Sequence, residues 1–426
     1  MKNIISAIAI FISCYAPAWS QTPSTDTLRL DLPAAEKIFL DSNLSLLAQH
    51  FNIDINKAFE KQARLWDNPY LQTDQTLYDG KWFRHTTING VQYGQVFIQL
   101  TQLIRIGGKR NNLIRLSQDN TLSSTQQFDD MMRNLYFLLV TDFNNLYQLL
   151  ETDAVLDREL SSIKDLVKGM DAQLALGNIS LKENMRVKAL QYSLQSNRNT
   201  YQQQILELEG DLRKLLAIKD VVFIRPLIND PASKFSDSLS LVSLMDSARN
   251  NRPDLKFANT TKIFNQHNLA YQKAQAYPDL NVGVQYDRLS NYVPNYWGLD
   301  IGLPLPIWNR NKGNIEAARF SIEQSKTGIL EANIRADQEV TTSFMKYQSL
   351  QKLFQEIPAG MEEGYDKLAV KMLESYQQRQ VNLIEFLDFF NSYRETRVNQ
   401  LSQFASLRNS MAEINYTTGS KIFNLR

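Results

Sequence analysis

The most regular pattern in the chain is an alternation of apolar with small or polar residues between residues 280 and 304. It consists of two runs that are separated by a polar, turn-like segment. A period of two is typical of a β-strand with one apolar face and one face in contact with water. We therefore predict a β-hairpin over residues 280–304. The apolar positions are Leu280, Val282, Val284 and Tyr286 in the first run and Trp297, Leu299, Ile301 and Leu303 in the second.

A second hairpin is predicted over residues 70–103. Val96, Ile98 and Leu100 share one face of its second strand, while the alternation in its first strand is weaker. Aromatic residues gather near the turn ends of both hairpins, as in the aromatic girdles of membrane barrels. We expect the following side chains to lie at a membrane interface: Trp82, Phe83, Tyr286, Tyr292, Tyr296 and Trp297.

Long helices are predicted after each hairpin, over about residues 108–218 and 312–423. A helix of about 60 residues is roughly 90 Å long, far longer than a bilayer is thick. Ser180 and Glu183 form a capping box, which predicts a new helix after the break at Gly177. Apolar residues at alternating spacings of four and three form a heptad seam that predicts coiled-coil packing. They are Leu156, Leu160, Ile163, Val167, Met170 and Leu174.

The same order of elements occurs twice: helix, strand, strand, long helix, tip and long helix, at an interval of about 205 residues. A repeat of this length indicates a duplicated domain and not a solenoid. Pro226, Asn229-Asp230 and Pro231 mark a linker between the two halves. We predict a signal peptide over 1–20, a first repeat over 21–220, a linker over 221–238 and a second repeat over 239–426.

The N-terminus has the parts of an export signal. Lys2 precedes an apolar run, Ile4 to Ile12, and Ala18-Trp19-Ser20 offers a cleavage point. The alternative is a buried N-terminal helix. Cys14 is the only cysteine and lies within this signal, so we expect no disulfide bond in the mature chain. Lipidation of Cys14 is a further alternative, although the residues before it form a poor lipobox.

Charge and hydropathy exclude two broad classes of protein. The 426 residues include 46 Lys and Arg against 45 Asp and Glu, a balance that argues against nucleic acid as a partner. The mean hydropathy of −0.35 excludes a polytopic helical membrane protein. No later run of about 18 apolar residues predicts a spanning helix. An exported chain of this kind can still cross a membrane as a barrel.

Four strands of about ten residues can each span a bilayer, but four strands cannot close a barrel. Open sheet edges are not tolerated in lipid, so the chain is expected to oligomerise. Two copies would give eight strands with a filled interior, and three copies would give twelve strands around a lumen. We predict an α+β membrane protein with two structural repeats. The long helices need partners for their heptad seams and would form a helical barrel that continues the strand barrel.

Several segments resemble the TolC family of outer membrane factors, in particular the branch paired with cation-efflux pumps. They are Arg252-Pro253-Asp254-Leu255, Gly107-Gly108-Lys109-Arg110, residues 302–314 (GLPLPIWNRNKGN), and the tips at 176–180 and 376–383. The resemblance covers essentially the whole mature chain. It implies a homotrimer in the lipid of the bacterial outer membrane, with its helical tunnel in the periplasm. The implied fold is a trimeric 12-stranded outer-membrane β-barrel, four strands per chain, continued by a long periplasmic α-helical coiled-coil barrel.

The same resemblance implies a function. The chain would be the passive exit duct of a tripartite efflux pump, with metal cations or drugs as cargo. Its partners would be a periplasmic adaptor (membrane fusion protein) and an inner-membrane RND-type pump. A type I secretion channel is the alternative within the family.

The resemblance also points to residues at the periplasmic entrance. It implies that Glu385 and Asp388, three apart on one helix face, form stacked acidic rings that bind cations in a trimer. An ordinary solvated helix face is the alternative. The family's glycine at the second tip is Arg379 in this chain. The arginine of the family's entrance lock falls at Val381, which puts a lock of that form in doubt.

Adaptor contacts are implied at both tips. Turn chemistry explains Gly177 and Ser180 equally well, because glycine ends helices and serine caps them. The implied contact residues are Leu176, Gly177, Ser180, Leu181, Arg379, Val381, Asn382 and Leu383.

No constellation for catalysis or metal binding stands out. The three histidines, His50, His85 and His267, are scattered, and residues 107–110 lack the spacing of a P-loop. We expect no enzyme activity, no cofactor and no metal site. A periplasmic coiled-coil adaptor or scaffold would share the heptads but lack two amphipathic hairpins at matching places. An outer-membrane hydrolase is disfavoured because no catalytic constellation stands out in the sequence.

Overall fold

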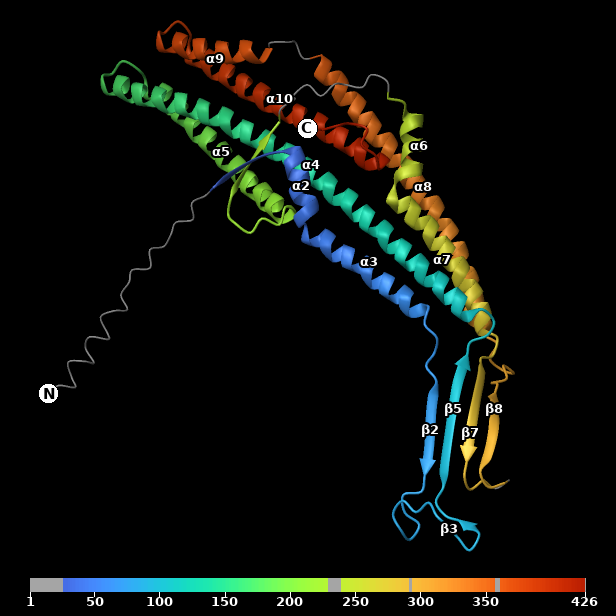
Figure 1. Cartoon of the computed structure of the whole chain (residues 1–426). Coiled ribbons are helices and arrows are strands. Elements are labelled where there is room, and N and C mark those ends of the chain that lie inside the picture. The colour runs from blue at the N-terminus through green and yellow to red at the C-terminus, as the bar shows by residue number, and fades with distance from the viewer. Residues whose placement is uncertain (1–25, 229–238, 291–292, 357–360, 426) are drawn as a thin grey trace, which may run out of the picture.

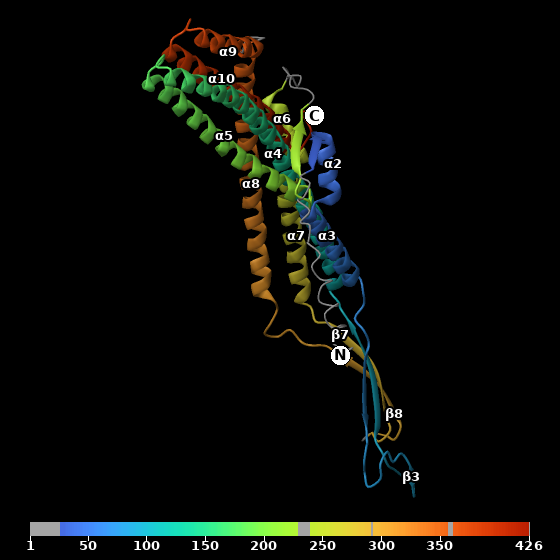
Figure 2. The same ribbon diagram turned by 90° about the vertical axis from the view of Figure 1, so that its left-hand side faces the viewer.

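The computed structural model describes residues 26–228, 239–290, 293–356 and 361–425. The predicted signal peptide and Tyr292 lie outside the described residues. A four-stranded sheet lies at one end of an elongated molecule, and long helices extend from it toward the other end (Figures 1 and 2).

The four-stranded sheet joins the two segments for which hairpins were predicted. Its order is β2–β5–β7–β8, and each strand is antiparallel to its neighbour, so that β2 and β8 form the edges. The bounds are Tyr70–Gln75 for β2, Val96–Ile104 for β5, Leu280–Asp287 for β7 and Tyr296–Gly302 for β8. The register aligns an apolar row across all four strands, which consists of Leu71, Leu100, Val284 and Leu299.

The two faces of this sheet have opposite chemistry. The side chains of the apolar row are between 45% and 66% exposed. The adjacent row, on the other face, contains Gln72, Gln99 and Gln285, and Nε2 of Gln99 donates a hydrogen bond to Oδ2 of Asp300 at 3.1 Å. Side chains of successive residues alternate between faces, so the sheet has an exposed apolar face and a hydrogen-bonded polar face. This is the arrangement of a barrel wall between lipid and water.

The segment between β2 and β5 contains a small hairpin of its own. Its strands are β3 (Thr87–Ile88) and β4 (Val91–Gln92), which pair in antiparallel fashion. Asn89 and Gly90 connect them, both with positive φ angles, as a two-residue hairpin turn requires.

A long helix, α4, forms the spine of the helical part. It contacts α3, α5, α7 and α10, and α8 packs on α7. The helices α3, α4, α7 and α8 thus form a row that continues the four strands (Figure 1). The bounds are Leu32–Ser42 for α2, Leu44–Ala63 for α3, Lys109–Ala175 for α4, Leu181–Leu215 for α5, Leu241–Asn251 for α6, Pro253–Gln275 for α7, Lys312–Gln355 for α8, Met361–Gln377 for α9 and Leu383–Thr418 for α10.

The helical part differs from the sequence prediction in one respect. The helix expected after β8 is described in two parts, because α8 ends at Gln355 and α9 begins at Met361. Within the part of the chain that the structure describes, no helix has both the length and the apolar character needed to cross a bilayer.

The corner between β5 and α4 is made by two glycines. Gly107 and Gly108 have φ angles of +67° and +76°, in the left-handed region that glycine adopts without strain. The first residue of α4, Lys109, is 5% exposed, and its Nζ lies 2.8 Å from Oδ1 of Asp279, just before β7. The two hairpins are therefore held together at the junction of sheet and helices.

The predicted heptad seam of α4 is buried at the end of the helices far from the sheet. Leu156, Leu160 and Ile163 are at most 3% exposed. They belong to an apolar cluster with α5 and α10, whose members include Val187 and Phe386. The coiled-coil pattern thus packs three long helices against one another, with side chains of α9 at the margin.

A strand lies where the sequence predicted a linker. Residues Phe223–Leu227 form β6, which pairs in parallel with β1 (Thr27–Asp31). Ile224 is fully buried and Leu30 is 7% exposed. Pro226 is tolerated because each strand of a two-stranded sheet is an edge. The rest of that segment, residues 229–238, lies outside the described residues.

Candidate functional site

The two predicted tips lie beside each other at the end of the molecule far from the sheet (Figures 1 and 2). One tip joins α4 to α5 and the other joins α9 to α10. A cavity of about 560 Å³ separates them, and Gln173 and Glu183 of the first tip line it together with Arg379 and Leu383 of the second. The structure therefore brings the residues predicted from the two halves of the chain into one site.

Both tips have the same backbone turn. At the first, the N–H of Gly177 donates to the carbonyl of Leu174 at 3.0 Å; at the second, the N–H of Arg379 donates to the carbonyl of Tyr376 at 3.0 Å. Gly177 and Arg379 have φ angles of +74° and +60°. This is the left-handed C-terminal cap that usually carries glycine. Arg379 thus adopts a left-handed backbone conformation that is unfavourable for any residue with a side chain.

The helices after the tips are also capped alike. Oγ of Ser180 accepts from the N–H of Glu183, and Oε2 of Glu183 accepts from the N–H of Ser180, both at 3.2 Å. This is the predicted capping box. At the second tip, Oδ1 of Asn382 accepts from the N–H of Glu385 at 3.0 Å. The caps fix where α5 and α10 begin, and hence where Glu385 lies.

Changing Arg379 to glycine is expected to stabilise the second tip by about 1 kcal/mol, because a side chain in the left-handed conformation costs about that much. Hydrogen–deuterium exchange of residues 376–383 should become slower. The control is Gln380→Gly, at the next position, where φ is not positive; it should not slow exchange. Unchanged or faster exchange in Arg379→Gly would mean that contacts of the arginine side chain offset the strain.

The predicted acidic pair lies on the exposed side of α10. Glu385 and Asp388 are exposed, while Leu383, Phe386 and Phe390 on the opposite side are buried in the cluster with α4 and α5. Glu385 lies in the first turn of α10, where the helix dipole favours negative charge. The dipole accounts for Glu385 and a solvated helix face accounts for Asp388, so the acidic ring stays a prediction.

The predicted adaptor contacts differ in exposure. Leu176 and Leu181 are 71% and 64% exposed, and no other part of the described chain covers them. Val381 is half-buried. Leu383 is 8% exposed and packs inside the cluster with Phe386. Of the predicted contact residues, Leu383 therefore has a packing role, and the exposed leucines offer the apolar surface.

Sequence reasoning missed Glu159, a buried charge behind the tips. Its side chain is 1% exposed, and its Oε1 lies 3.8 Å from Nη1 of Arg394 on α10. Neither carboxylate oxygen has a hydrogen-bond partner among the residues that the structure describes. Burial raises the pKa of Glu159 to about 7, against the opposing attraction of Arg394. The position is flanked by Leu156 and Leu160 of the heptad seam, where a charged residue is ordinary, so the pattern carried no signal.

The predicted interface aromatics lie at the far end of the sheet. The rings of Tyr286 and Trp297 are 5.2 Å apart between centroids, and Trp297 is 73% exposed. Trp82 and Phe83, in the loop between β2 and β3, are 72% and 61% exposed. Tyr296 precedes Trp297 in β8 and lies on the other face of the sheet.

Histidine and acidic side chains form no cluster in the described residues that could hold a metal ion. His267 pairs instead with Asp119, its Nδ1 lying 2.6 Å from Oδ2 of the carboxylate. Nδ1 of His50 likewise lies 3.5 Å from Oδ2 of Asp54, one helical turn away.

Comparison with known proteins shows what this chain is similar to. A sequence profile described as outer membrane efflux protein matches residues 244–357, which include α7, β7, β8 and α8. These residues are thus similar to an outer membrane efflux protein domain. The resemblance to outer membrane factors that the sequence indicated is confirmed, while the cation-efflux branch stays a prediction. No curated protein sequence matches the chain.

Solved structures extend the likeness to almost the whole chain. A membrane protein from Pseudomonas aeruginosa is 14% identical with a TM-score of 0.73, over 93% of this chain and 94% of that one. CusC is 16% identical with a TM-score of 0.70, over 92% and 94%. The Campylobacter jejuni CmeC outer membrane channel is 14% identical with a TM-score of 0.70, over 91% and 85%. At such identities the likeness shows the fold, which is that of the outer membrane factors.

Proposed function

We propose that this chain forms a homotrimeric exit duct across the bacterial outer membrane, through which an efflux pump releases its cargo. One observation carries the proposal: a four-stranded sheet with an exposed apolar row on one face, a polar row on the other and two unpaired edges. In lipid, each unpaired backbone group at such an edge costs several kcal/mol. Pairing β8 of one copy with β2 of the next removes both edges and closes a barrel with a polar interior.

The helices support the same closed ring. The outer helices of the row are α3 on one flank and α8 on the other. Both present large apolar side chains that nothing in the described chain covers, and a head-to-tail contact between unlike flanks closes into a ring. Those of α3 are Leu44, Leu47, Phe51, Ile55 and Phe59, and those of α8 include Phe320, Leu330, Ile334 and Met345. A ring of three copies contributes twelve strands, enough for a lumen.

The partners and the cargo are proposed from the family. The exposed leucines at the tips, Leu176 and Leu181, suit contact with a periplasmic adaptor, and an inner-membrane pump of the RND type would supply the energy. The duct itself has little selectivity, so the pump determines whether the cargo consists of metal cations or drugs. At its entrance, three copies of Glu385 and Asp388 would form acidic rings that attract cations.

Single-channel recording in a planar bilayer tests the duct and its entrance together. The native trimer is expected to conduct with cation selectivity, and Glu385→Ala with Asp388→Ala should reduce that selectivity and the block by divalent cations. The matched control is Glu151→Ala with Glu207→Ala, which removes the same charge from exposed positions on α4 and α5.

The possible results separate the two parts of the proposal. A pore whose selectivity is equal in both double variants keeps the duct and rejects the acidic entrance. An absence of conductance in the native protein and in variants that loosen the tips, such as Phe386→Ala, rejects the duct.

A further inference from the structure

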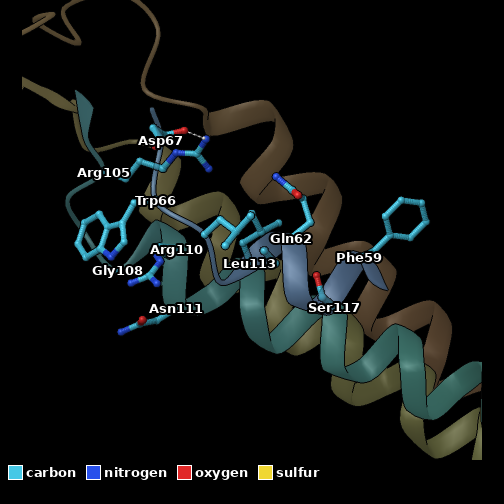
Figure 3. A pocket seen from close by; sticks show the side chains of 12 residues that line it. Phe59, Gln62, Trp66, Asp67, Arg105, Gly108, Arg110, Asn111, Leu113 and Ser117 are labelled. Atoms are coloured by element: carbon cyan, nitrogen blue, oxygen red, sulfur yellow. Dashed lines mark hydrogen bonds and ion pairs between the residues drawn. The ribbon is translucent and has the colours of Figure 1, made fainter. Parts of the chain in front are cut away.

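A pocket lies where α3 leads into β2, beside the first turn of α4 (Figure 3). Its volume is about 470 Å³. We call it the junction pocket; its walls include Phe59, Leu65, Trp66, Asp67, Arg105 and Arg110. The three apolar side chains among them are between 61% and 66% exposed. The pocket thus has an apolar rim that nothing in the described chain covers.

The polar side of the junction pocket is already ordered. Nη2 of Arg105 lies 2.7 Å from Oδ1 of Asp67. The guanidinium of Arg110 lies over the ring of Trp66, 4.4 Å from its centroid, and donates to the carbonyl of Arg64. Nε of Arg110 is buried without a hydrogen-bond partner in the described chain. Trp66 is therefore held in one orientation by a stacked cation, as a preformed binding surface would be.

The opposite flank of the molecule carries a matching apolar segment, residues 303–308, directly after β8. Trp308 is 92% exposed, more than any other large apolar side chain in the described residues, and Leu305 is 68% exposed. Pro304 and Pro306 keep the segment from continuing the sheet, because proline has no N–H to donate. The segment therefore projects from the edge of the chain.

The strand order brings the pocket and the segment to the same level. The edge strand β2 begins at Tyr70, directly after the pocket residues Leu65, Trp66 and Asp67, whereas β8 ends at Gly302. The two edge strands run in opposite directions within the sheet. When β8 of one copy pairs in antiparallel fashion with β2 of the next, residues 303–308 of the first copy lie alongside residues 63–69 of the second.

We propose that Trp308 of each protomer packs into the junction pocket of its neighbour, against Trp66 and Leu65. The occupant is thus a second copy of this chain, and the inference rests on the proposed trimer. The contact seals each protomer boundary where the barrel meets the helices. It also covers apolar side chains that are otherwise left in water. Two tryptophans at one contact supply large, rigid apolar surfaces with specific geometry.

Photo-crosslinking tests the contact directly. Trp308 is replaced by p-benzoylphenylalanine, which keeps an aromatic side chain, and the trimer in outer-membrane vesicles is irradiated. Mass spectrometry should find crosslinks to residues 59–67 of another copy. Crosslinks that reach only lipid or other segments, while native gels still show trimers, overturn the inference alone. Loss of the trimer in the unmodified protein overturns the proposed assembly as well.

A double-mutant cycle provides a second, independent readout. Trp308→Ala and Trp66→Ala are each expected to lower the temperature at which the trimer dissociates by several degrees, and the double variant should lose little more than either one. The matched control is Tyr192→Ala, an exposed aromatic side chain of α5, which should leave the dissociation temperature unchanged. Fully additive losses would show that the two tryptophans do not contact each other, and would overturn the inference.

Discussion

Replacing Arg252 with methionine is expected to lower the free energy of unfolding by about 3 kcal/mol, since removing one partner of a buried ion pair leaves the other charge uncompensated. Arg252 is only 2% exposed. Its Nε and Nη2 donate to the two carboxylate oxygens of Asp254 at 3.0 and 2.7 Å. Its Nη1 donates to Oε2 of Glu339 at 2.7 Å and to the carbonyl of Thr417 at 3.2 Å. One side chain thus links the start of α7 to α8 and to the end of α10.

The charges of this network reinforce one another. Burial alone would lower the pKa of Arg252, but the hydrogen bonds to Asp254 and Glu339 outweigh it and raise the pKa above its ordinary value. Burial would likewise raise the pKa of Asp254, and the bonds from Arg252 reverse the effect and lower it. Both groups therefore stay charged at neutral pH in the native protein.

Urea unfolding followed by far-ultraviolet circular dichroism measures the effect of Arg252→Met. The matched control is Arg249→Met, one turn earlier, which removes an exposed pair between Arg249 and Asp337 at 3.0 Å. Such exposed pairs contribute at most about 1 kcal/mol. Equal destabilisation by the two substitutions would contradict the assignment of Arg252 as the link between the three helices.

Replacing Glu159 with glutamine is expected to stabilise the tips at about pH 8 by roughly 1–3 kcal/mol, and to change little at about pH 4. The physical reason is the burial of its carboxylate, which raises the pKa from 4.5 to about 7. Between these values the folded protein binds a proton that the unfolded chain does not. Folding stability therefore falls as the pH rises through this window. Glutamine does not titrate, so the variant lacks this loss.

Thermal unfolding at a series of pH values checks the prediction for Glu159→Gln. The difference between variant and native protein should grow between about pH 4.5 and 7 and then level off. Taking the difference removes the contribution of Asp142, whose pKa is raised to about 6 by burial and by nearby Asp211 in both proteins. The control, Glu207→Gln, changes an exposed glutamate of α5. A difference that is constant with pH would show that Glu159 has the same pKa in the folded and the unfolded protein, and would contradict the prediction.

Part of the candidate site was accessible from local sequence. The capping box between Ser180 and Glu183 forms as predicted, because both partners lie within one turn. Gly177 ends its helix for the same local reason. Local sequence could not predict the different burial of two leucines: Leu383 packs inward, while Leu181 stays exposed. The two residues come after similar caps, and only the packing of α10 against α4 and α5 separates them.

The chain by itself determined the elements of the fold. The alternation over residues 280–304 predicted β7 and β8, and the heptad seam predicted the packing side of α4, because both periods record which face of an element is apolar. The same alternation predicted that aromatic residues lie at the turn end of the sheet. Each of these patterns lies within a few turns or strand residues, where backbone geometry alone relates sequence position to direction.

Only the tertiary structure decided what covers each face. The pairing of β1 with β6 joins segments almost 200 residues apart, and β6 has no periodic pattern of its own. The burial of Glu159 depends on α10, and the junction pocket depends on how α3, β2 and α4 meet. Periodicity tells which side of an element avoids water, but the energy of a buried charge or an open pocket is set by neighbours from distant parts of the chain.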